Sequence, residues 1–347
     1  MKKKRVFITG GAGFLGCHLA RQLVKKGYIV TLYDIAPLDA KDLIGKVTYI
    51  KGNILNEKSL DKAIRGHEYV VHAAAALPIL REKKIIFDVN INGTRNVLNY
   101  SFIHKVKRLI FISSTAVYGV PKHLPEKETN PLDPIGYYGE SKIAGEKLCL
   151  EFEKKGLQIN IIRPKTFLGP ERLGIFELWL EAMYSGKRVF ILGNGRNRYQ
   201  LLAVSDAVEA IIKTLTIPIH GEIFNIGAKE FSTWRNDLGH VISRSKSKAK
   251  ITSLPVLPSQ LFLSLLELLN LSPVAKWHFK TLPVHSYISI KKAEKMLGWH
   301  PKKSNKQLLL ESYQWYTAHR HEIINRVGTT HRVGWNFQLL NIIRRYL

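Results

Sequence analysis

The feature that most constrains the fold is a glycine-rich turn set between an apolar run and a helical pattern, in RVFITGGAGFLGCHLARQLVKKG (residues 5–27). The β-branched run at residues 5–9 predicts a buried parallel strand. Leucines at helical spacing then predict a helix that ends at Gly27. The same letters have the outline of a secretory signal, but Thr9 and four glycines interrupt its apolar core and no clear cleavage region follows. A strand, a glycine turn and a helix are therefore the better interpretation.

Strands and helices continue to alternate up to residue 170. Between helical patterns, apolar strand patterns lie at residues 28–34, 47–53, 69–75 and 108–114. Parallel strands need helical crossovers, so the alternation predicts an α/β protein with a Rossmann-type doubly wound parallel sheet. Beyond it we expect a smaller, mostly helical C-terminal substrate lobe. The expected domains are 1–170, to which 201–227 return, a discontinuous lobe at 171–320 and a basic amphipathic tail at 321–347.

The glycines fit a dinucleotide-binding turn. Gly10 permits a tight turn, Gly13 lets the backbone approach a pyrophosphate, and Gly16 allows close packing of helix on strand. Unpaired N–H groups at the helix start attract the phosphates. Asp34 ends the next strand, where its carboxylate can accept hydrogen bonds from the adenosine ribose and would repel a 2′-phosphate, so NAD is the expected cofactor. Asn53 is either an adenine contact or a turn residue.

Tyr138 and Lys142 lie one helical turn apart in YYGESK, and therefore on one helix face. A free tyrosine, with a pKa of about 10, is a poor base at neutral pH. We expect the ammonium of Lys142 and an oxidised nicotinamide to lower the pKa of Tyr138, while Lys142 also holds the nicotinamide ribose. Ser114 ends a predicted strand, and its hydroxyl can bind the substrate oxygen that Tyr138 deprotonates.

Seven motifs follow one another between residues 9 and 164: TGGAGFLG, YD at 33–34, VVHAAA at 70–75, VNINGTRNVL at 89–98, SSTAVYG at 113–119, YGESK at 138–142 and RP at 163–164. This set resembles the extended short-chain dehydrogenase/reductase family, in particular its NAD-dependent epimerase/dehydratase group, typified by UDP-galactose 4-epimerase. The stretch ISIKKAEKMLGWHPK at 288–302 resembles the C-terminal signature of that family.

The resemblance implies a catalytic triad of Ser114, Tyr138 and Lys142, and a homodimer. His72 is expected to be a packed, hydrogen-bonded histidine rather than a catalytic acid or base. Cofactor contacts are expected from Gly10, Gly13, Phe14, Leu15, Gly16, Asp34, Asn53, Ile54, His72, Ala73, Ala74, Asn90, Tyr138, Lys142 and Pro164.

Two departures from the family pattern bear on the reaction. Ser-Thr-Ala stands at 114–116 where dehydratases of the family typically carry Thr-Asp-Glu, so the acids that eliminate water are missing and dehydration is disfavoured. Tyr-Gln stands at 199–200 where members often carry Arg-Asp-Phe, whose arginine helps bind a nucleotide diphosphate. Arg196 and Arg198, just before it, are candidate substitutes, and Thr115 is a further candidate substrate contact.

Composition limits the compartment and the partners. Two cysteines exclude a disulfide framework and favour a reducing cytoplasm. With 53 Lys and Arg against 27 Asp and Glu, the net charge of +26 attracts anions, but no specific nucleic-acid signature and no metal-ligand spacing accompany it. The apolar stretch 258–277 predicts a buried or substrate-covering helix. The basic, aromatic tail at 331–347 is compatible with peripheral contact at the inner membrane face.

Three functional hypotheses follow. The first is an NAD-dependent epimerase of a nucleotide sugar, in which Tyr138 removes a hydroxyl proton and the transient ketone turns and is reduced on its other face. The second is an NAD-dependent dehydrogenase or reductase of a hydrophobic, sterol-like or lipid-linked alcohol at the membrane surface, favoured by the apolar stretch, the tail and the missing Arg-Asp-Phe. The third, a non-catalytic NAD-binding protein, is disfavoured by the intact Ser–Tyr–Lys set.

Overall fold

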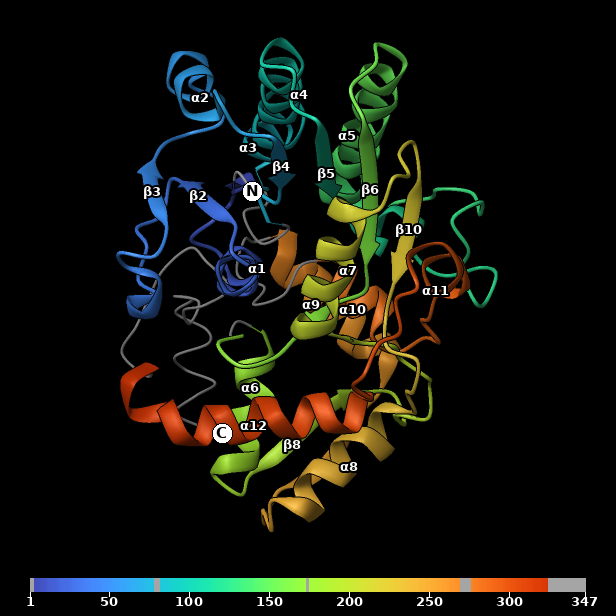
Figure 1. The fold of residues 1–347 in the computed structure, drawn as a ribbon. Helices are drawn as coiled ribbons and strands as arrows, with labels where there is room; N and C mark the ends of the chain where they lie inside the picture. The colour runs from blue at the N-terminus through green and yellow to red at the C-terminus, as the bar shows by residue number, and fades with distance from the viewer. Residues whose placement is uncertain (1–2, 78–81, 173–174, 269–275, 324–347) are drawn as a thin grey trace.

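A seven-stranded parallel sheet forms the centre of the molecule (Figure 1). The computed structural model describes residues 3–77, 82–172, 175–268 and 276–323. Across the sheet the strands are β10 (Ile223–Ile226), β6 (Ile159–Pro164), β5 (Arg108–Ile112), β4 (Tyr69–His72), β1 (Arg5–Thr9), β2 (Ile29–Asp34) and β3 (Thr48–Lys51). The strand order reverses at β1 and β4, which is the position where doubly wound sheets bind ligands. The predicted Rossmann-type fold is confirmed.

Helices cover both faces of the sheet (Figure 1). On one face α1 (Phe14–Lys25) packs against α7 (Val204–Thr216), and on the other α2 (Glu57–Ile64) and α5 (Gly136–Lys154) flank α4 (Thr94–Ile103). Because both faces are covered, the strands are buried and largely apolar: all six residues of β6 are buried, including Asn160 and Arg163. Short helical segments complete this part, namely Lys41–Leu43, α3 (Lys83–Phe87), a π-helical turn at Asp88–Gly93 and a 3₁₀ turn at Thr115–Tyr118.

A second, smaller core lies beyond one end of the sheet (Figure 1). Its strands pair in two short parallel ladders, β8 (Arg188–Leu192) with β11 (Lys250–Leu254), and β7 (Phe167–Leu168) with β9 (Leu202–Ala203). Its helices are α6 (Ile175–Tyr184), α8 (Trp234–Arg244), α9 (Val256–Leu268), α10 (Lys276–Thr281) and α12 (Asn305–Ile323). This lobe faces the sheet across the cavity described below.

Residues 288–299 lie inside the range expected for the lobe, but they pack on the sheet domain. Helix α11 (Lys291–Leu297) contacts α7 and β10, and Ala293 and Leu297 belong to the core under the sheet. The indole of Trp299 is fully buried there and donates a hydrogen bond to the carbonyl oxygen of Asp206 at 3.0 Å. An apolar face that fits the groove between α7 and β10 therefore returns this segment to the first core.

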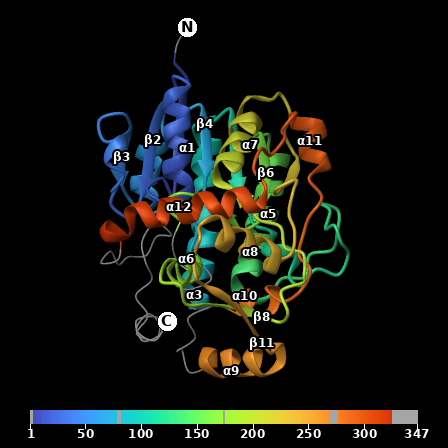
Figure 2. The same cartoon turned by 90° about the horizontal axis from the view of Figure 1, so that it is seen from below.

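The apolar stretch 258–277 is only partly what its composition predicts. Helix α9 has no buried residue, and Leu257, Leu261 and Leu268 are 73%, 71% and 79% exposed, so the prediction of a buried helix is wrong. Figure 2 shows α9 at the margin of the molecule, beside α10. Residues 269–275 and the tail from 324 onward lie outside the described residues. Within the described ranges, no helix has the length and apolar character that crossing a membrane requires.

Candidate active site

One cavity of about 600 Å³ lies between the carboxyl ends of the strands and the lobe. Most residues expected to touch the cofactor line it: Gly10, Gly13, Phe14, Leu15, Gly16, Asp34, Asn53, Ile54, Ala73, Ala74, Tyr138, Lys142 and Pro164. Ser114 and Thr115 line it as well. The sequence-predicted catalytic and cofactor residues therefore converge on a single space, apart from His72 and Asn90.

The glycine turn has no space for side chains at Gly10 and Gly16. Gly10 has a φ of +70°, and a Cβ there would stand 2.7 Å from the backbone nitrogen of Ala74. A Cβ on Gly16 would stand 2.4 Å from the carbonyl oxygen of Gly10. Helix α1 starts at Phe14 without a side-chain cap at Gly13 and without an acid in its first turn. Its free N–H groups thus face the cavity, which fits a pyrophosphate.

Asp34 is held rigidly at the end of β2. Its carboxylate accepts hydrogen bonds from the backbone N–H groups of Ala12, at 2.9 Å, and Ala36, at 3.0 Å. Burial raises the pKa of Asp34, and these bonds counteract that effect. Ile35, beside Asp34 in the lining, offers no cation to a 2′-phosphate. These residues fit NAD.

Asn53 has a turn role. Its side-chain oxygen accepts a hydrogen bond from the N–H of Leu55 at 2.9 Å, as an Asx turn does. Its carbonyl oxygen accepts a hydrogen bond from the hydroxyl of Tyr33 at 3.0 Å. The residue still lines the cavity, so the turn shapes the wall on the adenosine side.

His72 lies behind the cavity wall. One ring nitrogen is 2.7 Å from the hydroxyl of Thr9 and the other is 2.9 Å from the hydroxyl of Thr94. Burial, with a smaller effect of the Lys142 charge, lowers its pKa to about 3, so the ring is neutral at physiological pH. The packed, hydrogen-bonded role is the one observed, and the His72 side chain does not line the cavity.

Asn90 also acts from behind the wall. Its amide group bonds both the N–H and the carbonyl of Ala76, at 2.7 and 3.1 Å, and donates to the hydroxyl of Ser141 at 2.9 Å. That hydroxyl in turn donates to the carbonyl oxygen of Tyr138 at 2.8 Å. Asn90 therefore ties the segment after β4 to the catalytic helix α5 and does not line the cavity itself.

Ser114, Tyr138 and Lys142 lie together at the cavity. The ammonium of Lys142 donates to the carbonyl oxygen of Ile112 at 2.8 Å and lies 5.8 Å from the centre of the Tyr138 ring. Ser114 caps the turn after β5, where its hydroxyl accepts a hydrogen bond from the N–H of Ala116 at 3.1 Å. The end of β5 and the first turns of α5 thus place all three side chains on one wall.

The pKa of Tyr138 differs from the expectation. Burial raises it to about 12, whereas a hydrogen bond with Ser114 and the charge of Arg172 lower it less. Burial also lowers the pKa of Lys142 to about 8, so Lys142 loses its proton more readily than a lysine in water does. In the chain alone, desolvation therefore outweighs the charges that were expected to favour the phenolate.

A buried ion pair braces this wall. The guanidinium of Arg163 lies 2.6 Å from the carboxylate of Glu146 on α5 and donates to the hydroxyl of Tyr118 at 2.8 Å. Both charged side chains are almost completely buried. The pair connects β6 to α5, the helix that carries Tyr138 and Lys142. It therefore helps to fix the position of these two residues relative to the ends of the strands.

Arg196 and Arg198 do not reach the cavity. Both are exposed, and the guanidinium of Arg198 lies 4.8 Å from the ring centre of Phe231 and 5.0 Å from that of Tyr287. Their expected role as substrate contacts is not supported by this geometry, because the turn at residues 193–198 directs them outward.

Two cations that were not singled out in the sequence line the cavity instead. Lys165 directly follows Pro164, and its ammonium donates to the hydroxyl of Ser286 at 2.7 Å. Burial lowers its pKa to about 7, against a smaller opposing effect of Glu126. Arg172 follows β7 and is also buried. The signal for Lys165 was its place directly after a buried strand, where ligands sit in parallel sheets.

The wall formed by the lobe is aromatic and apolar. Trp234 stacks on Tyr199 with ring centres 4.6 Å apart and meets Trp179 edge to face at 5.0 Å. Phe176 extends this row. Further lining residues from the lobe are Phe167, Leu178, Phe190, Ile191, Leu192, Leu263, Trp277, His278, Phe279 and Leu282. In the described part of the chain, no group of His, Cys, Asp and Glu is arranged to hold a metal ion.

The protein is an NAD-dependent enzyme of the extended short-chain dehydrogenase/reductase type. Four features around one cavity define this class: the Rossmann sheet, the glycine turn, the aspartate at a strand end and the Ser–Tyr–Lys set. The comparisons with known proteins make the assignment specific. The model of the NAD dependent epimerase/dehydratase family matches residues 6–227, and the chain belongs to that family.

Its relatives differ in reaction. The chain is 30% identical over 338 residues to the UDP-N-acetyl-alpha-D-glucosaminuronate decarboxylase of Bacillus cytotoxicus, covering 90% of this chain and 98% of that protein. It is 28% identical over 319 residues to the decarboxylating sterol-4-alpha-carboxylate 3-dehydrogenase of Mus musculus, covering 86% and 87%. The solved structure of UDP-glucose 4-epimerase from Thermotoga maritima with UDP-glucose superposes with a TM-score of 0.78 at 25% identity, covering 91% and 99%.

Proposed function

We propose that this enzyme oxidises a secondary alcohol carried by a large apolar molecule, with NAD as the hydride acceptor. The observation that carries the proposal is the lobe wall: Phe176, Trp179 and Trp234 form an aromatic surface opposite the catalytic residues. Arg196 and Arg198, the two arginines that the sequence offers for a nucleotide diphosphate, lie outside the cavity. Burying an apolar body against such a wall stabilises the complex by about 25 cal/mol per Å² of apolar surface.

The chemistry follows from three side chains. Tyr138 takes the proton of the substrate hydroxyl, and Ser114 donates a hydrogen bond to the oxygen as it becomes a carbonyl. Lys142, anchored on the carbonyl oxygen of Ile112, holds the nicotinamide ribose and adds positive charge beside the phenol. NAD, when bound, supplies the hydride acceptor and a further positive charge.

The test is NADH formation by the purified enzyme with long-chain and polycyclic secondary alcohols. We expect stoichiometric NADH with at least one apolar alcohol and none with the matching ketone as the starting compound. If NADH never forms with apolar alcohols, while a nucleotide sugar is converted with no net change in NAD, the proposal is wrong.

Epimerisation of a nucleotide sugar is the second candidate. The observation that favours it is that the superposition on UDP-glucose 4-epimerase extends through the lobe, over 91% of this chain. The buried cations Lys165 and Arg172 are also available to an anionic substrate. Incubation with UDP-glucose and UDP-N-acetylglucosaminuronate, followed by separation of the products, distinguishes this candidate from the first.

An apolar substrate is consistent with docking on a lipid surface through α9. Phe262 and Leu265 are 60% and 55% exposed on this helix, alongside the exposed leucines given above, while Leu263 of the same helix lines the cavity. The net charge of +26 favours anionic headgroups. Leu261→Ser with Phe262→Ser should reduce co-sedimentation with phosphatidylglycerol vesicles, whereas Ile44→Ser, at an apolar residue that is 64% exposed elsewhere, should not. Equal binding of both variants would contradict the role of α9.

The expected homodimer has a candidate face on α4 and α5. These helices pack side by side, and Phe102, Ile103 and Leu150 are exposed on them. Three exposed apolar side chains on two neighbouring helices suit a self-complementary helical interface. Sedimentation of the wild type and of Phe102→Glu tests this: a dimer that persists in the variant excludes this face.

A further inference from the structure

We propose that Arg172 binds a carboxylate of the substrate close to the hydroxyl group that Tyr138 deprotonates. The inference rests on the proposed function, because it names the class of alcohol that the cavity takes: an acidic one with a large apolar body. Both residues line the same cavity, and their charges act on each other.

The first observation is that Arg172 is buried with two of its three guanidinium nitrogens unpaired. The residue is 9% exposed, and its Nε and Nη1 atoms have no hydrogen-bond partner in the described structure. Its guanidinium lies over the rings of Phe14 and Phe167, at 5.5 and 5.7 Å from their centres. Burial lowers the pKa of Arg172 to about 9, which shows how poorly the chain itself compensates this cation.

The second observation is the distribution of acids. Among the described residues that line the cavity, Asp34 is the only one with a carboxylate, and it stands at the adenosine end. The residues outside the described ranges contain no Asp or Glu at all, so they hold no acidic side chain that could pair with Arg172. An anion for this guanidinium therefore has to come from a ligand.

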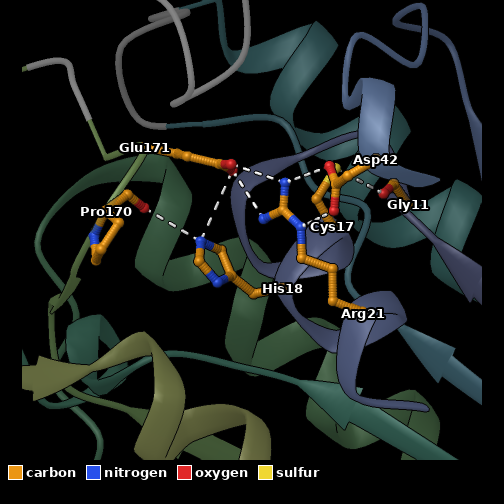
Figure 3. Close-up of polar contacts among 7 residues, drawn as sticks. All are labelled: Gly11, Cys17, His18, Arg21, Asp42, Pro170 and Glu171. Carbon is orange, nitrogen blue, oxygen red and sulfur yellow. Dashed lines mark hydrogen bonds and ion pairs between the residues drawn. The ribbon is translucent and has the colours of Figure 1, made fainter. Parts of the chain in front are cut away.

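The third observation is that Pro170 and Glu171, directly before Arg172, are held by the side chains of His18 and Arg21 on α1 (Figure 3). Glu171 has a φ of +71°, which is rare for a residue with a side chain. Its carboxylate is held by Arg21, at 2.7 and 3.1 Å, and Arg21 also grips Asp42 at 2.7 and 3.0 Å. His18 adds a contact to the carbonyl oxygen of Pro170 at 3.1 Å. With Glu171 tied outward, the next side chain is turned toward the cavity.

The chemistry of the surroundings favours a carboxylate. A guanidinium matches the planar, bidentate geometry of a carboxylate, and the flanking rings exclude water from the pair. The single charge of Arg172 balances one monoanion, whereas a diphosphate would leave charge uncompensated. The two lysines that line the cavity already have partners: Lys142 donates to the carbonyl oxygen of Ile112, and Lys165 is bonded to Ser286 and lies over the ring of Tyr199.

The test compares the binding of 3-hydroxyhexadecanoate, its methyl ester and UDP to the NAD-loaded enzyme. Quenching of tryptophan fluorescence reports binding, because Trp179, Trp234 and Trp277 line the cavity. We expect the wild type to bind the acid about tenfold to a hundredfold more tightly than the ester, as a charge-assisted hydrogen bond implies. Arg172→Met should lose this preference with unchanged affinity for the ester, and Arg172→Lys should keep part of it.

Arg198→Met is the matched control, since Arg198 also lies over two aromatic rings but outside the cavity. It should behave as the wild type. Thermal unfolding of Arg172→Met, expected at or above the wild-type temperature, shows that the variant is folded.

The outcomes separate the two proposals. If the ester binds and the acid binds no more tightly, or if Arg172→Met keeps the preference, the role of Arg172 is wrong and the apolar alcohol stands. If neither acid nor ester binds, both proposals fail. If UDP binds in a manner that needs Arg172 and the acid does not bind, the carboxylate is excluded and the epimerase gains support.

Discussion

The two walls of the cavity differ in whether their buried arginine is paired with an acid. Arg163, at the end of β6 below the catalytic wall, is 2% exposed and pairs with Glu146, while Arg172, nine positions later and facing the lobe, is 9% exposed and pairs with no acid in the described structure. The pKa of Arg163 is raised by that pairing against the opposing effect of burial. The pKa of Arg172 is lowered to about 9 by burial.

This difference separates a structural charge from a ligand-binding charge. A buried ion pair with satisfied hydrogen bonds holds secondary structure in place, because removing either partner leaves the other unpaired. A buried cation without an anion lowers stability and persists only where something else requires it. The charge of Arg163 is thus balanced within the chain, whereas we propose that a ligand balances the charge of Arg172.

The largest effect is expected for the paired arginine. Arg163→Met leaves Glu146 buried and unpaired, so the free energy of unfolding should fall by about 3–5 kcal/mol. Arg172→Met removes an unpaired charge and should leave the free energy of unfolding unchanged or raise it. Denaturant titration of both variants measures the contrast. Equal destabilisation would mean that Arg172 has a partner within the protein. The proposed difference between the two walls would then be wrong.

A substitution of Tyr138 on the catalytic wall should reduce activity and leave NAD binding intact. Tyr138→Phe removes the group that takes the proton, so turnover should fall by about 10²–10⁴-fold, while the affinity for NAD is kept. Tyr137→Phe is the control, because Tyr137 is 43% exposed and does not line the cavity. The checks are turnover with an accepted alcohol and NAD titration of both variants. Full activity in Tyr138→Phe would remove the phenol from the mechanism.

Much of the catalytic wall could be predicted from the sequence, because it is encoded locally. Buried parallel strands are continuous apolar runs, and the glycine turn, Asp34 and the spacing of Tyr138 and Lys142 each depend on neighbours a few positions away. Ser114 was identified because it follows a buried strand. The same rule applied to β6 would have found Lys165, which follows Pro164.

The lobe wall could not be predicted because its residues are placed by distant partners. Nothing in the chain near Arg163 and Arg172 tells the two apart: the partner of Arg163 is on α5, and the turn before Arg172 is fixed by Arg21 on α1. Arg198 was a candidate from sequence position alone, yet its turn directs it outward. The rise that burial causes in the pKa of Tyr138 could not be read from the sequence either, because burial is a property of the whole fold.

The glycine turn offers a packing test of the cofactor side. Gly16→Ala would place a Cβ 2.4 Å from the carbonyl oxygen of Gly10, so the backbone must shift, which costs about 1–3 kcal/mol of stability and weakens NAD binding. Gly239→Ala on α8 has no atom within 4 Å of its new Cβ and should be neutral or stabilising. Thermal unfolding with and without NAD separates the two. A Gly16→Ala enzyme with normal NAD affinity would show that close helix packing is not required there.

The smallest effect concerns Lys165, whose ammonium on the substrate side is bonded to a hydroxyl and attracted only weakly by Glu126. Its pKa in the folded protein is lowered to about 7 from the ordinary 10.5. Between these two values the unfolded chain binds a proton that the folded chain does not, so the stability contributed by this group increases with pH. The difference in the free energy of unfolding between wild type and Lys165→Met should therefore rise by about 1.4 kcal/mol per pH unit above pH 7. Denaturant titrations from pH 7 to pH 9 measure the slope, and loss of the hydrogen bond to Ser286 adds only a constant offset. A flat difference would mean that Lys165 keeps its proton in the folded state, and that the lobe side of the cavity compensates this cation as fully as the catalytic wall compensates Arg163.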